Sequence, residues 1–137
     1  MKTENRLPLT LLLLRLSVFL VMFVWTVEKF VEPQHASKIM AAFYSVGGVS
    51  NFVIYLFATI ELAVIVAFLL GFVKQWSYGL VLLMHAGSTL ASYKKYLQPF
   101  ESPNILFFAA IPMLAACFLL YYLREVDVFW TIKKRER

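Results

Sequence analysis

Cysteine, histidine and charge are scarce in this sequence, and each shortage excludes a class of function. The chain of 137 residues has one cysteine, Cys117, so an internal disulfide, a CxxC redox pair and a cysteine zinc site are all excluded. Its two histidines are His35 and His85. Because His35 falls in a polar stretch outside the apolar runs, we do not expect a haem held by both. We predict no metal site.

Charged residues make up only 15% of the chain, whereas hydrophobic residues make up 61% and aromatic residues 17%. Soluble domains carry about 25% charged residues, and a chain this short buries only about two-thirds of its unfolded surface. The sequence therefore predicts an integral membrane protein in contact with the lipid bilayer. The net charge of +5 arises at the ends of apolar runs, which is typical of membrane orientation signals and not of nucleic-acid binding.

Four apolar runs are long enough to cross a bilayer, which takes about 20 helical residues. We predict one domain over 1–137, an all-α bundle with spanning helices over about 8–31, 49–70, 76–96 and 105–123. The first run continues too far past its N-terminal core for a cleaved signal peptide, so we predict that it is retained. Pro33 and apolar residues at helical spacing predict a short amphipathic helix over about 34–44, lying in the membrane interface.

Charges outside the spans predict the orientation of the chain. Four spans place both termini on one side, together with the basic residues Lys2, Arg6, Arg15, Lys74, Arg124, Lys133, Lys134, Arg135 and Arg137. The other side has only Lys29, Lys38, Lys94 and Lys95. The positive-inside rule then predicts that both termini are cytoplasmic and that 124–137 forms a basic cytoplasmic tail.

Three ionisable side chains on three predicted helices fall within one layer of the membrane. From the helical rise, Arg15 lies about 10 Å, and Glu61 and His85 each about 14 Å, from the cytoplasmic end of their helices. An ionisable group inside the bilayer costs about 2.5–3.5 kcal/mol even on lenient scales, so each one needs a reason. We predict that Glu61 faces Arg15 or His85 inside the bundle, either as a structural ion pair or as a functional site.

Polar side chains also follow one face of the predicted third helix. This stripe includes Tyr78, His85, Ser88, Thr89 and Ser92. Arg15 and Lys29 share a face of the first helix, about four turns apart. Candidates for positions beside a small ligand are Tyr78, Ser88, Thr89, Ser92 and Lys29. Each polar residue also has a structural interpretation, because hydroxyls and a neutral histidine can join helices and Arg15 can reach the membrane surface.

Several short motifs combine these features. The first helix carries Leu14-Arg15-Leu16 and ends in Val27-Glu28-Lys29-Phe30 before Pro33, and the second carries Glu61 followed by Leu69-Leu70-Gly71. In these motifs, from Arg15 through the fourth helix, the chain resembles the DoxX family of small four-helix bacterial membrane proteins. It departs from the family at Thr26, where the family usually has glycine, and it lacks the paired cysteines of related thiol-handling membrane proteins.

The resemblance implies a location in the bacterial inner membrane and a role in membrane redox assemblies, since family members are linked to quinone-reducing or quinol-oxidising complexes and to oxidative-stress systems. We therefore expect a subunit or assembly partner of a quinone-linked respiratory complex, with other membrane subunits or further copies of the chain as partners. A proton-linked or small-solute transporter and a purely structural interaction protein are the alternatives. Because no nucleophile–base pair is visible, we do not expect the chain to catalyse a reaction alone.

Overall fold

The computed structural model describes residues 6–132, and all their regular structure is helical. The long helices are α1 (Arg6–Val31), α3 (Asn51–Leu69), α4 (Lys74–Ala91) and α6 (Ala110–Tyr122). The short ones are α2 (Pro33–Tyr44), α5 (Tyr93–Leu97) and the 3-10 helix η2 (Asn104–Ala109), which leads directly into α6. The all-α class predicted from the sequence is confirmed.

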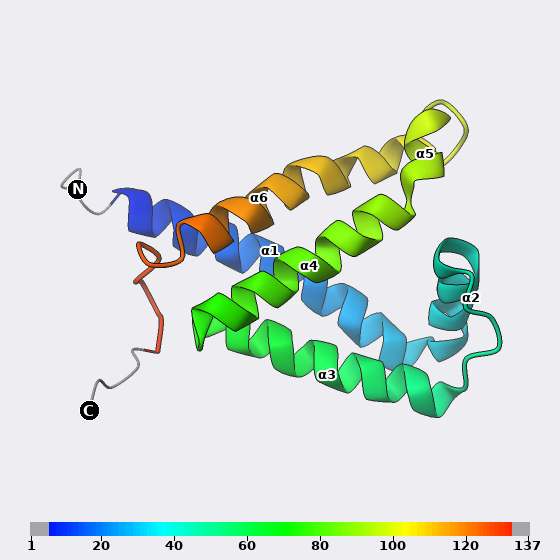
Figure 1. Ribbon diagram of the computed structural model, residues 1–137, viewed down its shortest axis with the longest axis horizontal. Helices are drawn as coiled ribbons and strands as arrows, with labels where there is room; N and C mark the ends of the chain where they lie inside the picture. The colour runs from blue at the N-terminus through cyan, green and yellow to red at the C-terminus, as the bar shows by residue number, and fades with distance from the viewer. Residues whose placement is uncertain (1–5, 133–137) are drawn as a thin grey trace.

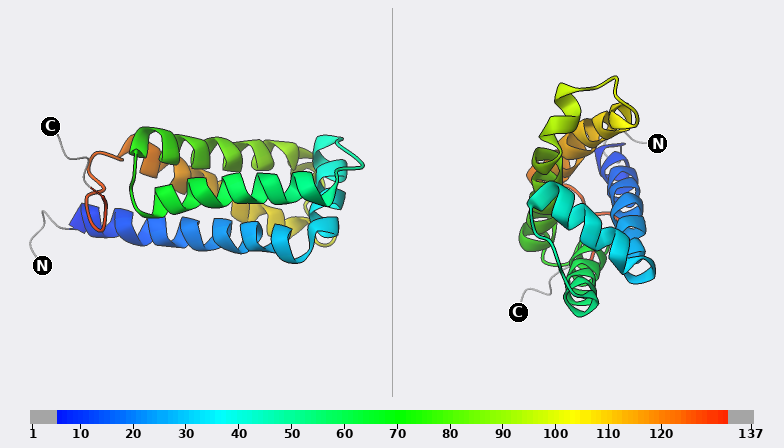
Figure 2. Two further views of the ribbon diagram at one scale, coloured as in Figure 1. Left: turned by 90° about the horizontal axis from the view of Figure 1, so that it is seen from below. Right: turned by 90° about the vertical axis from the view of Figure 1, so that its right-hand side faces the viewer.

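The four long helices form a ring in which each helix packs against two neighbours. α1 packs mainly on α3, and α4 packs mainly on α6. Contacts of α3 with α4 and of α1 with α6 close the ring. The helices alternate in direction, so the start of α1 and the segment that follows α6 lie at one end of the bundle, called here the terminal end (Figure 1). α2 lies across the opposite end, called here the α2 end (Figure 2).

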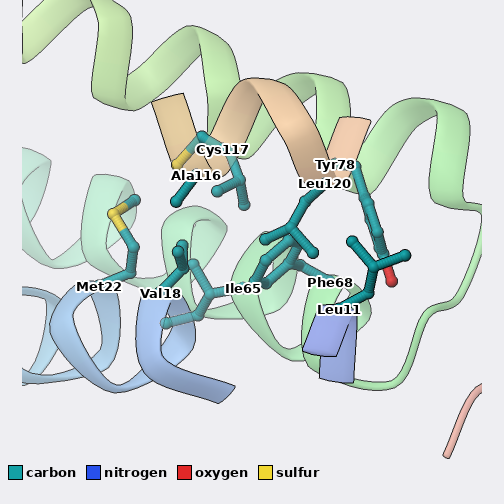
Figure 3. Packing of buried hydrophobic residues seen from close by; sticks show 10 residues of the cluster. Leu11, Val18, Met22, Ile65, Phe68, Tyr78, Ala116, Cys117 and Leu120 are labelled. Atoms are coloured by element: carbon teal, nitrogen blue, oxygen red, sulfur yellow. The ribbon is translucent and has the colours of Figure 1, made fainter. Parts of the chain in front are cut away.

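Buried apolar side chains from all four long helices meet in one core. Its members are Leu11, Val18, Met22, Ile65, Phe68, Tyr78, Val81, Ala116, Cys117 and Leu120. Figure 3 shows Met22 and Val18 of α1 facing Cys117 and Ala116 of α6, with Ile65 and Phe68 of α3 between them and Tyr78. The rings of Phe68 and Tyr78 meet edge to face, with their centroids 4.8 Å apart. The stripe predicted on the third helix therefore faces inward at Tyr78, His85 and Thr89, and Cys117 packs in the core.

Proline and glycine determine where the helices end. Glu32 leaves the helical conformation because a residue that precedes proline is disfavoured there, and Pro33 then begins α2 as its first residue. Gly48, with φ of +72°, lies in the turn before α3. The bounds of α2 agree to within one residue with the short helix predicted over about 34–44. The third predicted span is shorter than expected, since α4 ends at Ala91 and the chain continues as the separate helix α5.

Three helical stretches of the described chain are long and apolar enough to cross a membrane. They are Arg6–Val31, Asn51–Leu69 and Asn104–Tyr122, of which the last combines η2 and α6. Their outward surfaces expose large apolar side chains such as Leu20, Phe57 and Phe118. α4 is outside this set because it begins with Lys74-Gln75 and carries the polar inner stripe. The structure thus supports a membrane protein that contacts the lipid bilayer.

The segment that follows α6 packs on the bundle instead of leaving it. Residues 124–132, called here the strap, turn back across the terminal end (Figure 2). The Ile132 N–H donates to the carbonyl of Leu70, at the end of α3, over 2.9 Å. The sequence predicts a charged tail over 124–137, whereas 124–132 are docked. Residues 133–137, with the basic run of that tail, lie outside the described residues.

We expect Gly71→Ala to lower the melting temperature, because Gly71 has φ of +59° and a Cβ there would lie 2.5 Å from Cγ2 of Thr131 in the strap. The variant should lose about 1 kcal/mol or more of stability, since both the turn and the strap must shift. Gly87→Ala is the matched control: Gly87 lies inside α4 with nothing within 4 Å of an added Cβ, so it should be neutral or stabilising. Equal melting temperatures for the two variants in detergent would contradict the docked strap.

Candidate functional site

Arg15 is fully buried inside the terminal end, where it is paired with an acid 112 positions later in the chain. Its Nη1 donates to Oδ2 of Asp127 and to the hydroxyl oxygen of Tyr78, each over 2.9 Å. The Tyr78 hydroxyl in turn donates to the same carboxylate oxygen over 2.7 Å. These three side chains, called here the Arg15 cluster, come from α1, α4 and the strap, and therefore join three separate parts of the fold.

Arg15 also binds the backbone of the strap. Its Nη2 donates to the carbonyls of Phe129 over 2.6 Å and of Trp130 over 3.3 Å. Lys74, at the first turn of α4, donates through Nζ to two strap carbonyls, one of them that of Asp127 over 2.6 Å. The strap is irregular, so these carbonyls have no partner in a helix or sheet. The two cations supply the hydrogen-bond donors that they need. These two side chains therefore help to hold the strap across the terminal end.

The Arg15 cluster holds its members in a restrained arrangement. Trp130 has φ of +51°, a left-handed conformation that non-glycine residues seldom adopt unless their surroundings impose it. Arg15 Nε and Asp127 Oδ1 find no hydrogen-bond partner within residues 6–132. A buried charge pair of this kind is stable only while both partners are present, because either charge alone would lose its compensation. The cluster therefore acts as a single structural unit.

Glu61 pairs with Lys29 and Thr26, so the prediction that it faces Arg15 or His85 is wrong. Lys29 Nζ lies 3.0 Å from Oε2 of Glu61, and the Thr26 hydroxyl donates to Oε1 over 2.8 Å. The side chains of Lys29 and Glu61 are 29% and 17% exposed, so the pair is only partly buried. Thr26 itself is fully buried. The three form a second site, called here the Glu61 site, toward the α2 end of the bundle.

The register of α1 against α3 explains why Arg15 and Glu61 do not meet. Since the helices are antiparallel and Thr26 lies opposite Glu61, the last residue of α3, Leu69, lies level with about residue 18 of α1. Arg15 therefore lies beyond the end of α3, beside the turn into α4. The predicted depths of Arg15 and Glu61 were counted from the ends of their own helices. They would place both residues in one layer only if α1 and α3 ended in the same plane, and these helices do not.

The Glu61 site extends to α2. α2 packs on both α1 and α3. Burial, and then the negative charge of Glu61, raise the pKa of the hydroxyl of Tyr44, the last residue of α2. On the outer side of the same helix pair, His35 Nδ1 lies 2.6 Å from Oε1 of Glu28. The helix predicted as amphipathic thus covers the end of α1 that carries the Glu61 site.

His85 contacts a different helix from the one predicted. Its Nε2 donates to the carbonyl of Ala110 on α6 over 2.9 Å, and its side chain is almost completely buried. The Thr89 hydroxyl donates to the backbone carbonyl of His85 over 2.8 Å. His85 Nδ1 is without a partner in the described part of the chain. His85 therefore joins α4 to α6, in agreement with the interpretation that a neutral histidine can link two helices.

The serines of the predicted ligand stripe bond within their own helix. The Ser88 hydroxyl donates to the carbonyl of His85 over 3.1 Å, and the Ser92 hydroxyl donates to the carbonyl of Ser88 over 2.9 Å. Across residues 6–132, no hydrogen bond links His85 to Arg15 or Glu61, and no group of three or more histidine, cysteine or acidic side chains could hold a metal ion. Arg15, Glu61 and His85, predicted to lie in one layer, thus belong to three separate sites.

Sequence reasoning missed Asp127, although the sequence contains a signal for it. Asp127 is the lone acid in Val126-Asp127-Val128-Phe129-Trp130, an apolar and aromatic run that does not resemble a solvated tail. A single carboxylate in such a run needs a cationic partner if the run is buried. Thr26 was noted only as a departure from the family pattern, yet it supplies a hydrogen bond that glycine could not make.

We expect Arg15→Leu and Asp127→Leu each to lower the unfolding free energy by about 3–5 kcal/mol, and the double variant to lower it by less than the sum. The reason is that each single change leaves one buried charge unpaired. Arg15→Leu combined with Glu61→Gln is the control pair, which should be additive within about 0.5 kcal/mol because the residues share no partner. Coupling in the control pair but not between Arg15 and Asp127, measured by thermal unfolding in detergent, would contradict the observed pairing.

Thr26→Val should destabilise the chain by about 1 kcal/mol, while Thr26→Ser should retain the stability of the natural chain. Valine keeps the shape of threonine but removes the donor to Glu61, whereas serine keeps the hydroxyl. In a Glu61→Gln background the cost of Thr26→Val should fall, since an uncharged acceptor loses less. If valine and serine behave alike in the same melting assay, the hydrogen bond contributes nothing.

No protein-family model, no curated protein and no solved structure matches this chain. Its function is accordingly argued from the residues and contacts described above.

Proposed function

We propose that the chain is a small DoxX-like membrane protein that serves as a non-catalytic subunit or assembly partner of a quinone-linked redox complex in the bacterial inner membrane. One observation carries the non-catalytic part: charged side chains inside the bundle have internal partners, with Arg15 bonded to Asp127 and Glu61 bonded to Lys29. Side chains used in this way stabilise a scaffold. The redox context comes from the DoxX-like motifs, which include both Arg15 and Glu61.

In this proposal α4 is the fourth span and α2 is an interfacial helix. α4 lies between α3 and α6 in the ring, and its polar residues Tyr78, His85 and Thr89 are buried in the bundle, which removes them from lipid. α2 begins at a proline and buries only Ala36 among its described residues. A helix of this length at the end of a bundle fits the plane of the membrane surface better than a span.

The proposal places both termini in the cytoplasm. Of the nine basic residues counted on the terminal side, Arg15 is buried against Asp127 and no longer acts as a surface charge, which leaves eight against four on the other side. The terminal side therefore still has more basic residues than the other side when Arg15 is left out, and the positive-inside rule still gives cytoplasmic termini.

A fluorescent protein fused to the C-terminus should be fluorescent, and an alkaline phosphatase fused there should be inactive, since that enzyme works only outside the cytoplasm. A phosphatase fused after Gln98, between α5 and η2, should be active and serves as the control. The reverse pattern would contradict the orientation. Activity at both positions would mean that η2 and α6 do not cross the membrane, and would contradict the proposed four spans.

The separation of Arg15, Glu61 and His85 into different sites also helps to choose between a partner-binding protein and a transporter. A proton-linked transporter needs a connected set of titratable groups near the midplane, and the described hydrogen bonds leave Glu61 and His85 in different sites. Large aromatic residues on the outer surface, such as Phe52 and Tyr122, offer lipid or a neighbouring membrane chain an apolar contact. A partner-binding role is therefore better supported than transport.

The test is to purify the tagged chain from its native membrane in a mild detergent and to identify what remains attached. We expect a particle larger than the chain, which contains a second membrane subunit and supports quinone-dependent electron transfer. An unrelated tagged four-span protein from the same membrane is the control for adventitious association. A chain that runs alone or only with its own copies, and whose deletion leaves quinone reduction by the membranes unchanged, would contradict the proposal.

A further inference from the structure

The face of the strap that points away from the bundle is apolar. Between 126 and 132 the side chains alternate between exposed positions and buried or half-buried ones, and Asp127 is fully buried. The exposed side chains, called here the outer face of the strap, are Val126, Val128, Trp130 and Ile132. Trp130 is 78% exposed. An exposed face that is wholly apolar is typical of contact with a second apolar surface, which is either a membrane or another protein.

The strap lies at the depth of an apolar part of α1. α3 ends level with about residue 18 of α1, so the first turns of α1 extend past α3, and the strap lies beside them, bonded to Arg15 (Figure 2). Residues 7–14 of α1 carry no charge, and Leu13 among them is 59% exposed. All of α1 belongs to a stretch that is long and apolar enough to cross a membrane. A bilayer that covers the first turns of α1 therefore reaches the strap as well.

The apolar surface continues from the strap onto the turn between α3 and α4. The Ile132 N–H is bonded to the carbonyl of Leu70, and Thr131 packs on Gly71. Leu70 and Phe72 of this turn are exposed, as are large apolar side chains along the outward surface of α3. The outer face of the strap is thus continuous with the surface that contacts lipid. This continuity favours lipid over a soluble protein as the partner of the outer face.

The backbone of the strap fits the surface of a bilayer better than its hydrocarbon interior. The carbonyls of 127–130 all accept hydrogen bonds from side chains, which are those of Arg15, Lys74 and Thr131. The N–H groups of 128–131, in contrast, have no backbone acceptor within residues 6–132. In hydrocarbon these donors would remain unsatisfied, whereas water and lipid head groups at the interface can accept from them.

We propose that the outer face of the strap lies in the membrane interface at the terminal end of the bundle, where it contacts the boundary between lipid head groups and acyl chains. Trp130 is the most exposed member of this face, and indole rings are enriched at that boundary. The strap is then held from inside by Arg15 and Lys74 and from outside by lipid. This contact holds for either orientation of the chain and does not depend on the redox role proposed above.

The first test measures the depth of Trp130 in reconstituted vesicles. In a Trp25→Phe, Trp76→Phe chain the remaining indole is Trp130. We expect phosphatidylcholine brominated near the glycerol end of its acyl chains to quench this indole at least about twofold more strongly than the same lipid brominated near the chain ends. Leu20→Trp, in a chain whose three natural tryptophans are replaced by phenylalanine, is the matched control, because Leu20 is exposed near the middle of α1. It should show the reverse order.

Two other results of this measurement would overturn the proposal. Quenching of Trp130 by aqueous iodide, without quenching by either brominated lipid, would mean that the outer face lies in water. Protection from iodide and from both lipids would mean that another protein or a second copy of the chain covers the face.

A pair of variants tests whether the apolar side chains cause the contact. Val126→Asp with Val128→Asp should reduce the quenching of Trp130 by brominated lipid by about half or more, because carboxylates favour water over the interface. Val126→Thr with Val128→Thr keeps the side-chain shape without a charge and should retain the quenching. Undiminished quenching in the acidic variant, with an unchanged melting temperature in detergent, would overturn the proposal. If the acidic variant does not fold, the depth of Trp130 in the otherwise natural strap decides by itself.

Discussion

A guanidinium that lies inside the bundle cannot be left without a carboxylate, and this requirement on Arg15 organises the terminal end of the molecule. Asp127 supplies the charge, Tyr78 bridges the pair, and the carbonyls of Phe129 and Trp130 take the remaining donors. To deliver these groups the chain must turn back after α6 and cross the bundle end. The position of the strap and its close contact with Gly71 depend on that turn.

The parts that could be predicted from the sequence are those set by local periodicity. The bounds of α1 and α2 were predicted to within two residues, and the spacing of Tyr78, His85 and Thr89 predicted the buried face of α4. These features depend on one helix at a time. Proline and glycine set most of the ends for the same reason, since their conformational limits act within one or two residues.

The pairing of charges could not be predicted because it depends on how far each helix extends past its neighbour. Arg15, Glu61 and His85 were assigned to one site on the assumption that the helices end in one plane. α3 ends well short of the start of α1, so Arg15 meets the strap and Glu61 meets Lys29. Asp127 was missed because its segment follows the last span, where the charge around it indicated a tail.

The distance in sequence between Arg15 and Asp127 has a consequence for biosynthesis. The two residues are 112 positions apart, and at about 5–20 residues per second the ribosome needs roughly 6 to 22 seconds to make the second after the first. During that interval α1 contains an arginine whose permanent partner does not yet exist. Until the strap is synthesised, α1 must keep this side chain at the membrane surface or in contact with water and insertion machinery, so the first helix is committed to its final place only when the chain is almost complete.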